Sequence, residues 1–273
     1  MSVQHQPSHP ALGHRSQPTA AGVYDWCLRG RHHLPCDADA AIAAQRLFPL
    51  AGRTAQYNRD FLRRAVRWLV TDGGIRQFLD IGSGYPTAGN VHEIARTHAP
   101  DTRVVYVDLD PDTVAVSNRL LAQDPDTVCL QGDLRDPDNI FGQPQIELLN
   151  LDQPIALLLV SVLPFVAGDA TSLIRRYTTR LARGSYLAIT HITPPEDERT
   201  RRQQAELAKT YNAVVQQTAH LRTRDQITDL FAGTELIHPG LVRATDWQPP
   251  QGYQPDLSDQ AAAVILGGVA RIP

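Results

Sequence analysis

Phe78-Leu79-Asp80-Ile81-Gly82-Ser83-Gly84 passes from an apolar run directly into a glycine turn. The apolar residues from Ile75 to Ile81 predict a strand, and the segment 90–98 predicts the helix that follows the turn. Glycines at such a turn let the backbone approach a ligand, and they leave N–H groups free at the start of the helix. The stretch therefore predicts a ligand site at the carboxyl end of the first strand.

The rest of the chain alternates between short apolar runs and helical patterns. Further strands are expected at 103–109, 127–131, 154–163 and 185–191, with helices at 111–123 and 169–182. The run 154–163 is almost wholly apolar, as a parallel strand covered on both faces requires. Two last strands are expected at 235–242 and 261–269. This rhythm predicts an α/β fold with a doubly wound, mostly parallel, seven-stranded sheet.

Acidic residues follow the next two predicted strands. Asp108, with Leu109 beside it, lies where a carboxylate can accept hydrogen bonds from both hydroxyls of a ribose. Asp133, beside Leu134, lies where a carboxylate can accept from an adenine amine, although a surface acid in a loop is the alternative. Asp110 precedes a proline and is expected to cap a helix. Thr87 replaces the third glycine of the dinucleotide motif, which argues against a nicotinamide enzyme.

Composition favours a soluble enzyme and excludes other classes of protein. The net charge of −3 gives no basic surface potential that would attract nucleic acid. The sequence has no run of 18 apolar residues, so no membrane span is predicted. The N-terminus has no apolar signal region, so a cytoplasmic location is expected. Three scattered cysteines predict neither a disulfide framework nor a metal site.

Three regions are expected along the chain. Residues 1–20 are rich in His, Pro, Gln and Ser and predict a disordered tail. Residues 21–74 predict a lid, irregular up to Leu50, followed by an amphipathic helix that Asn58 and Arg59 open. Residues 75–273 form the binding domain, with a helical insertion near 193–222. A thin apolar stripe at 207–215 in that insertion could pack against a second subunit or against its own domain, so a homodimer is one expectation.

The run Phe78–Glu93 resembles the actinobacterial S-adenosyl methyltransferase family, which was long catalogued as a domain of unknown function. The resemblance extends through 58–66, 105–111, 133–137, 184–187 with His191, and 238–242. It implies a class I methyltransferase with a Rossmann-like fold, a terminal antiparallel hairpin and S-adenosylmethionine as cofactor. The cofactor contacts it suggests are Asp80, Gly82, Ser83, Gly84, Asn90, Asp108, Leu109, Asp133 and Leu134. Arg59 is then a candidate anchor for the cofactor's carboxylate, and Ser161 lies beside the expected path of the methyl group.

The chain departs from the family pattern in two places. Arg29, His32 and His33 interrupt a motif that usually has two glycines, lysine, aspartate and asparagine, and Pro164 stands where a histidine is usual. His191, Tyr24 and His33 are the candidates for a catalytic base. The acceptor is expected to be a small molecule of specialised metabolism. The alternative is a protein that binds the sulfonium without methyl transfer, for a rearrangement or as a regulatory ligand.

Overall fold

The computed structural model describes residues 15–86, 89–195, 198–199, 201–202, 204–206 and 218–273. Its sheet has eight strands in the order β3-β2-β1-β4-β5-β8-β6, and β7 pairs with β8. The strands are β1 (Gln77–Ile81), β2 (Arg103–Asp108), β3 (Thr127–Gln131), β4 (Ala156–Val160), β5 (Tyr186–Ile192), β6 (Glu235–Leu236), β7 (Val242–Arg243) and β8 (Ile265–Arg271). The first five pair in parallel, and β8 runs antiparallel to β5. The predicted doubly wound, mostly parallel fold is confirmed.

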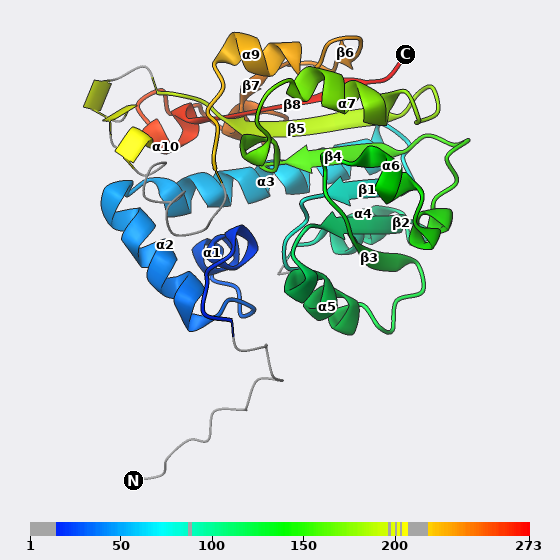
Figure 1. Ribbon diagram of the computed structural model, residues 1–273. Coiled ribbons are helices and arrows are strands. Elements are labelled where there is room, and N and C mark those ends of the chain that lie inside the picture. Colours follow the sequence, from blue (N-terminus) through cyan, green and yellow to red (C-terminus); the bar gives the residue numbers. More distant parts are fainter. Residues whose placement is uncertain (1–14, 87–88, 196–197, 200, 203, 207–217) are drawn as a thin grey trace.

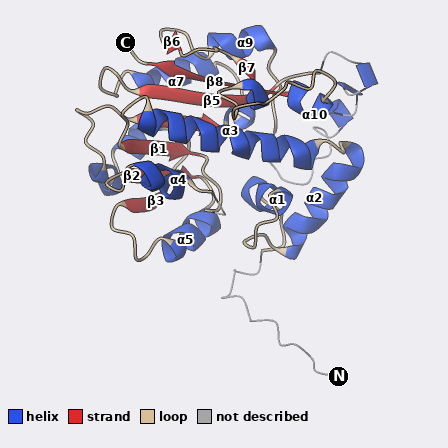
Figure 2. Ribbon diagram, turned by 180° about the vertical axis from the view of Figure 1, so that it is seen from behind, coloured by secondary structure: helices blue, strands red, loops and turns tan. Residues whose placement is uncertain are grey.

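Helices cover both faces of the sheet (Figures 1 and 2). One face packs against α3 (Ala51–Thr71) and α4 (Val91–His98). The other packs against α6 (Pro137–Phe141), α7 (Ala170–Thr178) and α9 (Arg224–Asp229). Alternate residues of β4 point to opposite faces, so Leu157 and Leu158 are both buried, but in different halves of the core. The remaining elements are α5 (Pro111–Leu120), α10 (Gln260–Ala263), η1 (Pro144–Leu148), η2 (Leu163–Phe165) and η3 (Ala244–Asp246).

Two short helices precede the sheet and lie beside the first turns of α3 (Figure 1). They are α1 (Ala20–Cys27) and α2 (Pro35–Leu47), in a segment expected to be irregular. Thr19 caps α1, and Pro35 in the first turn of α2 starts an alanine-rich stretch, so local sequence supports both helices. Arg15 contacts the Asp37 carboxylate at 2.7 Å, so this part of the predicted disordered tail is ordered. Residues 1–14 lie outside the described residues.

Three other expectations change in detail. α3 begins at Ala51, so Asn58 and Arg59 lie well inside it and do not open it. The strand expected at 235–242 is split into β6 and β7, because Pro239 has no N–H for the ladder and Gly240 turns the chain at φ 86°. The start of the strand expected at 261–269 forms α10 instead. Most of the helical insertion predicted near 193–222, with its apolar stripe, falls outside the described residues.

Candidate functional site

The glycine turn after β1 has the conformation that its residue types predicted. Gly82 has φ 75°, and a Cβ atom added there would lie 2.3 Å from Val162 Cγ2. Only glycine therefore fits, for both its backbone conformation and its packing. The N–H groups of Gly82 and Ser83 donate to the carbonyl of Val107 at 2.8 and 3.1 Å, which fixes the turn to the end of β2.

Asp108 joins the glycine turn to the loop after β2. Its two carboxylate oxygens accept from the N–H of Gly84 at 2.8 Å and from the N–H of Asp110 at 3.0 Å. Burial raises the pKa of Asp108 to about 6, and these backbone hydrogen bonds hold it down in part. The next residue, Leu109, is 46% exposed, so its apolar side chain is accessible to a ligand beside the Asp108 carboxylate. This arrangement suits the ribose and adenosine contacts predicted for the pair.

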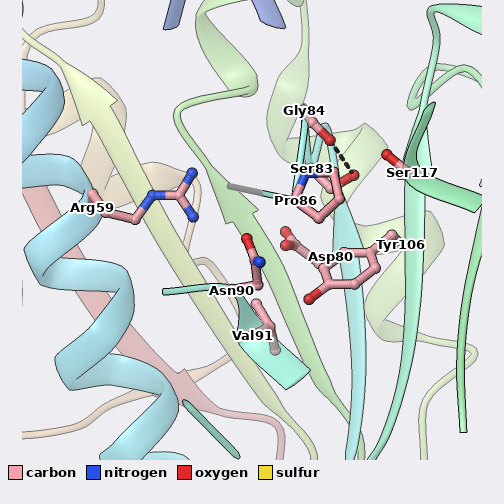
Figure 3. A pocket seen from close by; sticks show the side chains of 9 residues that line it. All are labelled: Arg59, Asp80, Ser83, Gly84, Pro86, Asn90, Val91, Tyr106 and Ser117. Carbon is pink, nitrogen blue, oxygen red and sulfur yellow. Dashed lines mark hydrogen bonds between the residues drawn. The ribbon is translucent and has the colours of Figure 1, made fainter. Parts of the chain in front are cut away.

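Arg59 and Asp80 place opposite charges on one small cavity (Figure 3). Arg59 reaches in from α3, and Asp80 lies near the carboxyl end of β1. Both are buried, at 7% and 6% exposed, and Nε of Arg59 has no hydrogen-bond partner among the described residues. Burial raises the pKa of Asp80 to about 7, while the nearby Arg59 acts to lower it. A buried guanidinium with an unpaired nitrogen and a buried carboxyl group on one cavity suit a ligand that carries both a carboxylate and an ammonium group.

Tyr24 and Asn58 hold Arg59 in place. The Arg59 guanidinium carbon lies 5.6 Å from the centre of the Tyr24 ring. Asn58 donates to the Tyr24 hydroxyl at 2.7 Å and accepts from the Thr190 hydroxyl at 2.6 Å. Burial raises the pKa of Tyr24, and its hydroxyl also donates to the Ala55 carbonyl at 3.3 Å. The sequence suggested that Tyr24 is a catalytic base. These contacts suit a different role for Tyr24, namely positioning Arg59.

Sequence reasoning missed several residues that line this cavity: Pro86, Val91, Tyr106 and Ser117. Tyr106 could have been found, because it precedes Asp108 by two positions and so shares its face of β2. Its hydroxyl accepts from the N–H of His92 at 3.1 Å and lies 2.8 Å from His92 Nδ1. Asn90 lines the cavity as predicted, and the Glu93 carboxylate accepts from the Asn90 N–H at 2.9 Å.

Three other predicted contacts, Asp133, Leu134 and Ser161, have different surroundings. Asp133 is paired with Arg135, whose Nε lies 2.8 and 3.0 Å from the two carboxylate oxygens. An adenine amine would therefore have to share that carboxylate with Arg135. Leu134 is buried in the core at 7% exposed. Ser161 has φ 61°, a left-handed conformation that is unusual for serine and costs about 1 kcal/mol. Such strain is concentrated at functional sites, and Ser161 directly follows β4.

His191 is buried at the end of β5, with both ring nitrogens occupied. Nδ1 lies 2.7 Å from the carbonyl of Ile192, and Nε2 lies 2.8 Å from Nη1 of Arg222. The carbonyl can only accept, so Nδ1 carries the proton and Nε2 accepts from Arg222. Burial, with Arg222 adding to it, lowers the pKa of His191 to about 4. The structure therefore places His191 in a packing role and gives no support to the predicted base.

His33 has the opposite arrangement. Its Nδ1 lies 2.9 Å from Oδ2 of Asp25, and the same oxygen accepts from the N–H groups of His32 and His33, each at 3.0 Å. Asp25 is 2% exposed, whereas the His33 side chain is 24% exposed. Among the described residues, Nε2 of His33 has no partner. Of the two candidate histidines, only His33 keeps an open ring nitrogen among the described residues.

The family model of the S-adenosyl methyltransferases matches residues 8–273. The chain belongs to the S-adenosyl methyltransferase family. A Thermobifida fusca YX protein with a provisional methyltransferase assignment is 35% identical, with a TM-score of 0.88 over 94% of this chain and 96% of that one. A DUF574 family protein of Streptomyces avermitilis MA-4680 is 36% identical, with a TM-score of 0.86 over 94% and 98%. No curated protein matches the chain.

This membership confirms the predicted family, fold and enzyme class, with S-adenosylmethionine as the cofactor. The charged and polar groups that line the cavity suit that cofactor chemically. The methionine end of S-adenosylmethionine carries an α-carboxylate and an α-ammonium group, and the buried Arg59 and Asp80 that line this cavity have side chains complementary to them. None of the helices in the described ranges is long and apolar enough to cross a membrane.

Proposed function

We propose that this S-adenosyl methyltransferase acts on a small-molecule acceptor of specialised metabolism. The supporting observation is that α1 packs against Gly84 and Arg59, two residues that line the cofactor cavity. A Cβ atom on Gly84 would lie 3.8 Å from Cβ of Ala21, and three residues further along α1 the ring of Tyr24 faces Arg59. An acceptor must reach the methyl group under or around this helix. A small molecule can pass there, whereas a folded macromolecule is too large.

The residues of the cavity bind and orient, and they exclude water. Arg59 would hold the α-carboxylate of the cofactor, Asp80 the α-ammonium group and Asp108 the ribose hydroxyls. When bound, S-adenosylmethionine supplies an electrophilic methyl group for in-line displacement. The cavity has a volume of about 10 Å³, which is room for one water molecule. Cofactor binding therefore requires this cavity to widen.

Departures from the family pattern support an acceptor particular to this chain. Arg29, His32 and His33 lie in the loop between α1 and α2, next to the cavity's cover. Pro164 is buried in η2, where the family usually has histidine. Because Pro164 has no titratable group, a second candidate function is cofactor binding without methyl transfer, for a rearrangement or for regulation.

The test of the cofactor role is binding of S-adenosylhomocysteine by calorimetry to the wild type, Arg59→Ala and Arg67→Ala. Loss of a buried charge-assisted contact of about 1.5–3 kcal/mol should weaken binding roughly 10- to 150-fold in Arg59→Ala. Arg67→Ala, an exposed arginine two turns further along α3, should bind like the wild type. Equal affinity of all three proteins would remove the proposed anchor.

The test of the acceptor class uses S-adenosylmethionine labelled in the methyl group. The protein is incubated separately with small-molecule extracts and with the protein and RNA fractions. Label should enter the small-molecule fraction together with S-adenosylhomocysteine. Label confined to a macromolecular fraction would contradict the proposal, and tight binding without turnover on any fraction would favour the second candidate function.

A further inference from the structure

A second cavity, of about 660 Å³, lies between α1, α2 and the first turns of α3. Its lining includes Trp26, Arg29, His33, Gln56 and Tyr57. The volume falls in the range of pockets for small molecules, about 300–1,000 Å³. None of the residues that the cofactor is expected to contact lines this cavity, so a separate occupant has room there.

The second cavity and the cofactor cavity share two helices. On α3, Gln56 lines the second cavity and Arg59 lines the first. These residues are three positions apart, so they lie on one side of the helix, about 4.5 Å along its axis. On α1, Ala21 lies against the glycine turn, and Trp26 lines the second cavity. The two cavities thus lie on neighbouring stretches of the same two helices.

The lining of the second cavity favours an anion. Its charged side chains are Arg29 and Arg53, and no carboxylate is among the described residues that line it. Arg53 is already paired with Asp259 at 2.9 Å, whereas Arg29 has no partner among the described residues. Arg29 also has φ 58°, a left-handed conformation that costs about 1 kcal/mol in a residue other than glycine. Trp26 adds an aromatic face that suits a planar ligand.

His33 lines the same cavity and is oriented by Asp25. The carboxylate receives the N–H of Nδ1 at 2.9 Å, so the lone pair of the neutral ring is on Nε2. Gly30 makes this possible, because a Cβ there would lie 2.0 Å from Oδ1 of Asp25. A histidine backed by a buried carboxylate, with its second nitrogen open, is the arrangement of a general base.

We infer that the second cavity binds a planar aromatic acceptor that carries an anionic group and a hydroxyl, and that His33 deprotonates this hydroxyl. The inference rests on the proposed function. The acceptor O–H proton passes to Nε2 of His33, and the oxygen forms a bond to the methyl carbon. The bond from methyl to sulfur breaks with its electron pair left on sulfur, giving the methyl ether and S-adenosylhomocysteine. His33 then releases the proton to solvent. Arg29 pairs with the anionic group, and Trp26 packs on the ring.

The binding test uses 3,4-dihydroxybenzoate and its uncharged counterpart catechol as probes, on the full chain saturated with S-adenosylhomocysteine. Titration is followed by tryptophan fluorescence, and Trp26→Phe should remove the response. The wild type should prefer the carboxylate-bearing probe about tenfold, one ion-pair contact of about 1.4 kcal/mol. Arg29→Gln should lose this preference, whereas Arg31→Gln, a neighbouring exposed arginine outside the cavity lining, should keep it.

The base is tested by methyl transfer to 3,4-dihydroxybenzoate in His33→Asn and His32→Asn. His33→Asn should bind both ligands within about twofold but lose roughly 100-fold or more in rate. His32→Asn should keep the rate, and added imidazole should restore part of it in His33→Ala. An unchanged rate in His33→Asn would overturn the assignment of the base. If the wild type binds S-adenosylhomocysteine but shows no preference for 3,4-dihydroxybenzoate over catechol, the proposed acceptor site is wrong. Failure to bind S-adenosylhomocysteine would overturn the proposed function itself.

Discussion

The Tyr24 ring on α1 lies 5.6 Å from the guanidinium carbon of Arg59 on α3. This contact joins the helix that covers the cofactor cavity to the side chain that would anchor the cofactor. Arg59 has no salt bridge among the described residues, so the ring and the cavity determine where its charge lies. Under the proposed function, the lid therefore takes part in building the cofactor site.

Substitution of Tyr24 should separate the contribution of its ring from that of its hydroxyl. Tyr24→Phe keeps the ring over Arg59 but loses the hydrogen bond from Asn58, whereas Tyr24→Ala loses both. A cation–π contact of about 0.5–2 kcal/mol predicts that Tyr24→Ala binds S-adenosylhomocysteine roughly 2- to 30-fold more weakly than Tyr24→Phe. Calorimetry measures both affinities. Equal affinities would show that the ring does not position Arg59.

Gly82→Ala should destabilise the fold more than Gly74→Ala, although both positions have positive φ. At Gly74 nothing lies within 4 Å of an added Cβ. Only the strained backbone conformation of alanine then lowers the free energy of unfolding, by about 1 kcal/mol. At Gly82 the contact with Val162 adds about 1–3 kcal/mol. Urea unfolding measures the difference, and Val162→Ala added to Gly82→Ala should recover part of it. If the two alanine variants lose equal stability, the close packing of Val162 is not the constraint.

Asp80 should make the protein less stable as the pH rises. Burial raises the pKa of its carboxyl to about 7 in the fold, above the ordinary value of 3.8. The folded protein then holds a proton that the unfolded chain releases. Its contribution to stability is complete below about pH 4 and is lost progressively up to about pH 7.

Asp80→Asn should remove this loss, so its stability relative to the wild type should increase between pH 4 and 7. Chemical unfolding across that range, with the exposed Asp101→Asn as the matched control, measures the change. Asp108 contributes in the same direction in all three proteins, because burial raises its pKa to about 6. Parallel pH profiles for Asp80→Asn and the wild type would contradict the prediction.

His191 should act in the opposite direction. Its pKa is lowered to about 4 in the fold from an ordinary value of 6.5, so the unfolded chain takes up the proton first. The resulting stability is complete above about pH 6.5 and is lost as the pH falls toward 4. His191→Gln, which stays neutral and can accept from Arg222, should lose less stability between pH 7 and 5 than the wild type does. The exposed His98→Gln is the control.

The same variant tests whether His191 is a catalytic base. Because both ring nitrogens are already bonded, His191→Gln should keep methyl transfer within a few-fold of the wild-type rate at neutral pH. Transfer of label from S-adenosylmethionine is the measurement. A rate loss of roughly 100-fold with normal cofactor binding would restore His191 as the base.

The sequence alone predicted the five parallel strands and the glycine turn after β1. β3 has the bounds that its apolar run predicted, and Asp110 caps a helix as expected. These features depend on neighbours in the chain, namely periodicity, caps and glycine, so local sequence carries them. Family resemblance then pointed to the cofactor, and Arg59 does line the cavity with Asp80.

Only the tertiary structure decided the roles of the histidines and of the lid. His191 and His33 were equivalent candidates in the sequence, but one is enclosed by Arg222 and the other is aligned by Asp25 with a nitrogen left open. Local residues favour the two lid helices, but their packing against α3 determines where they lie relative to the sheet. Which partner a titratable side chain meets depends on contacts between residues far apart in the chain. Local sequence predicts where such a residue lies along the chain, and packing determines whether it can take a proton.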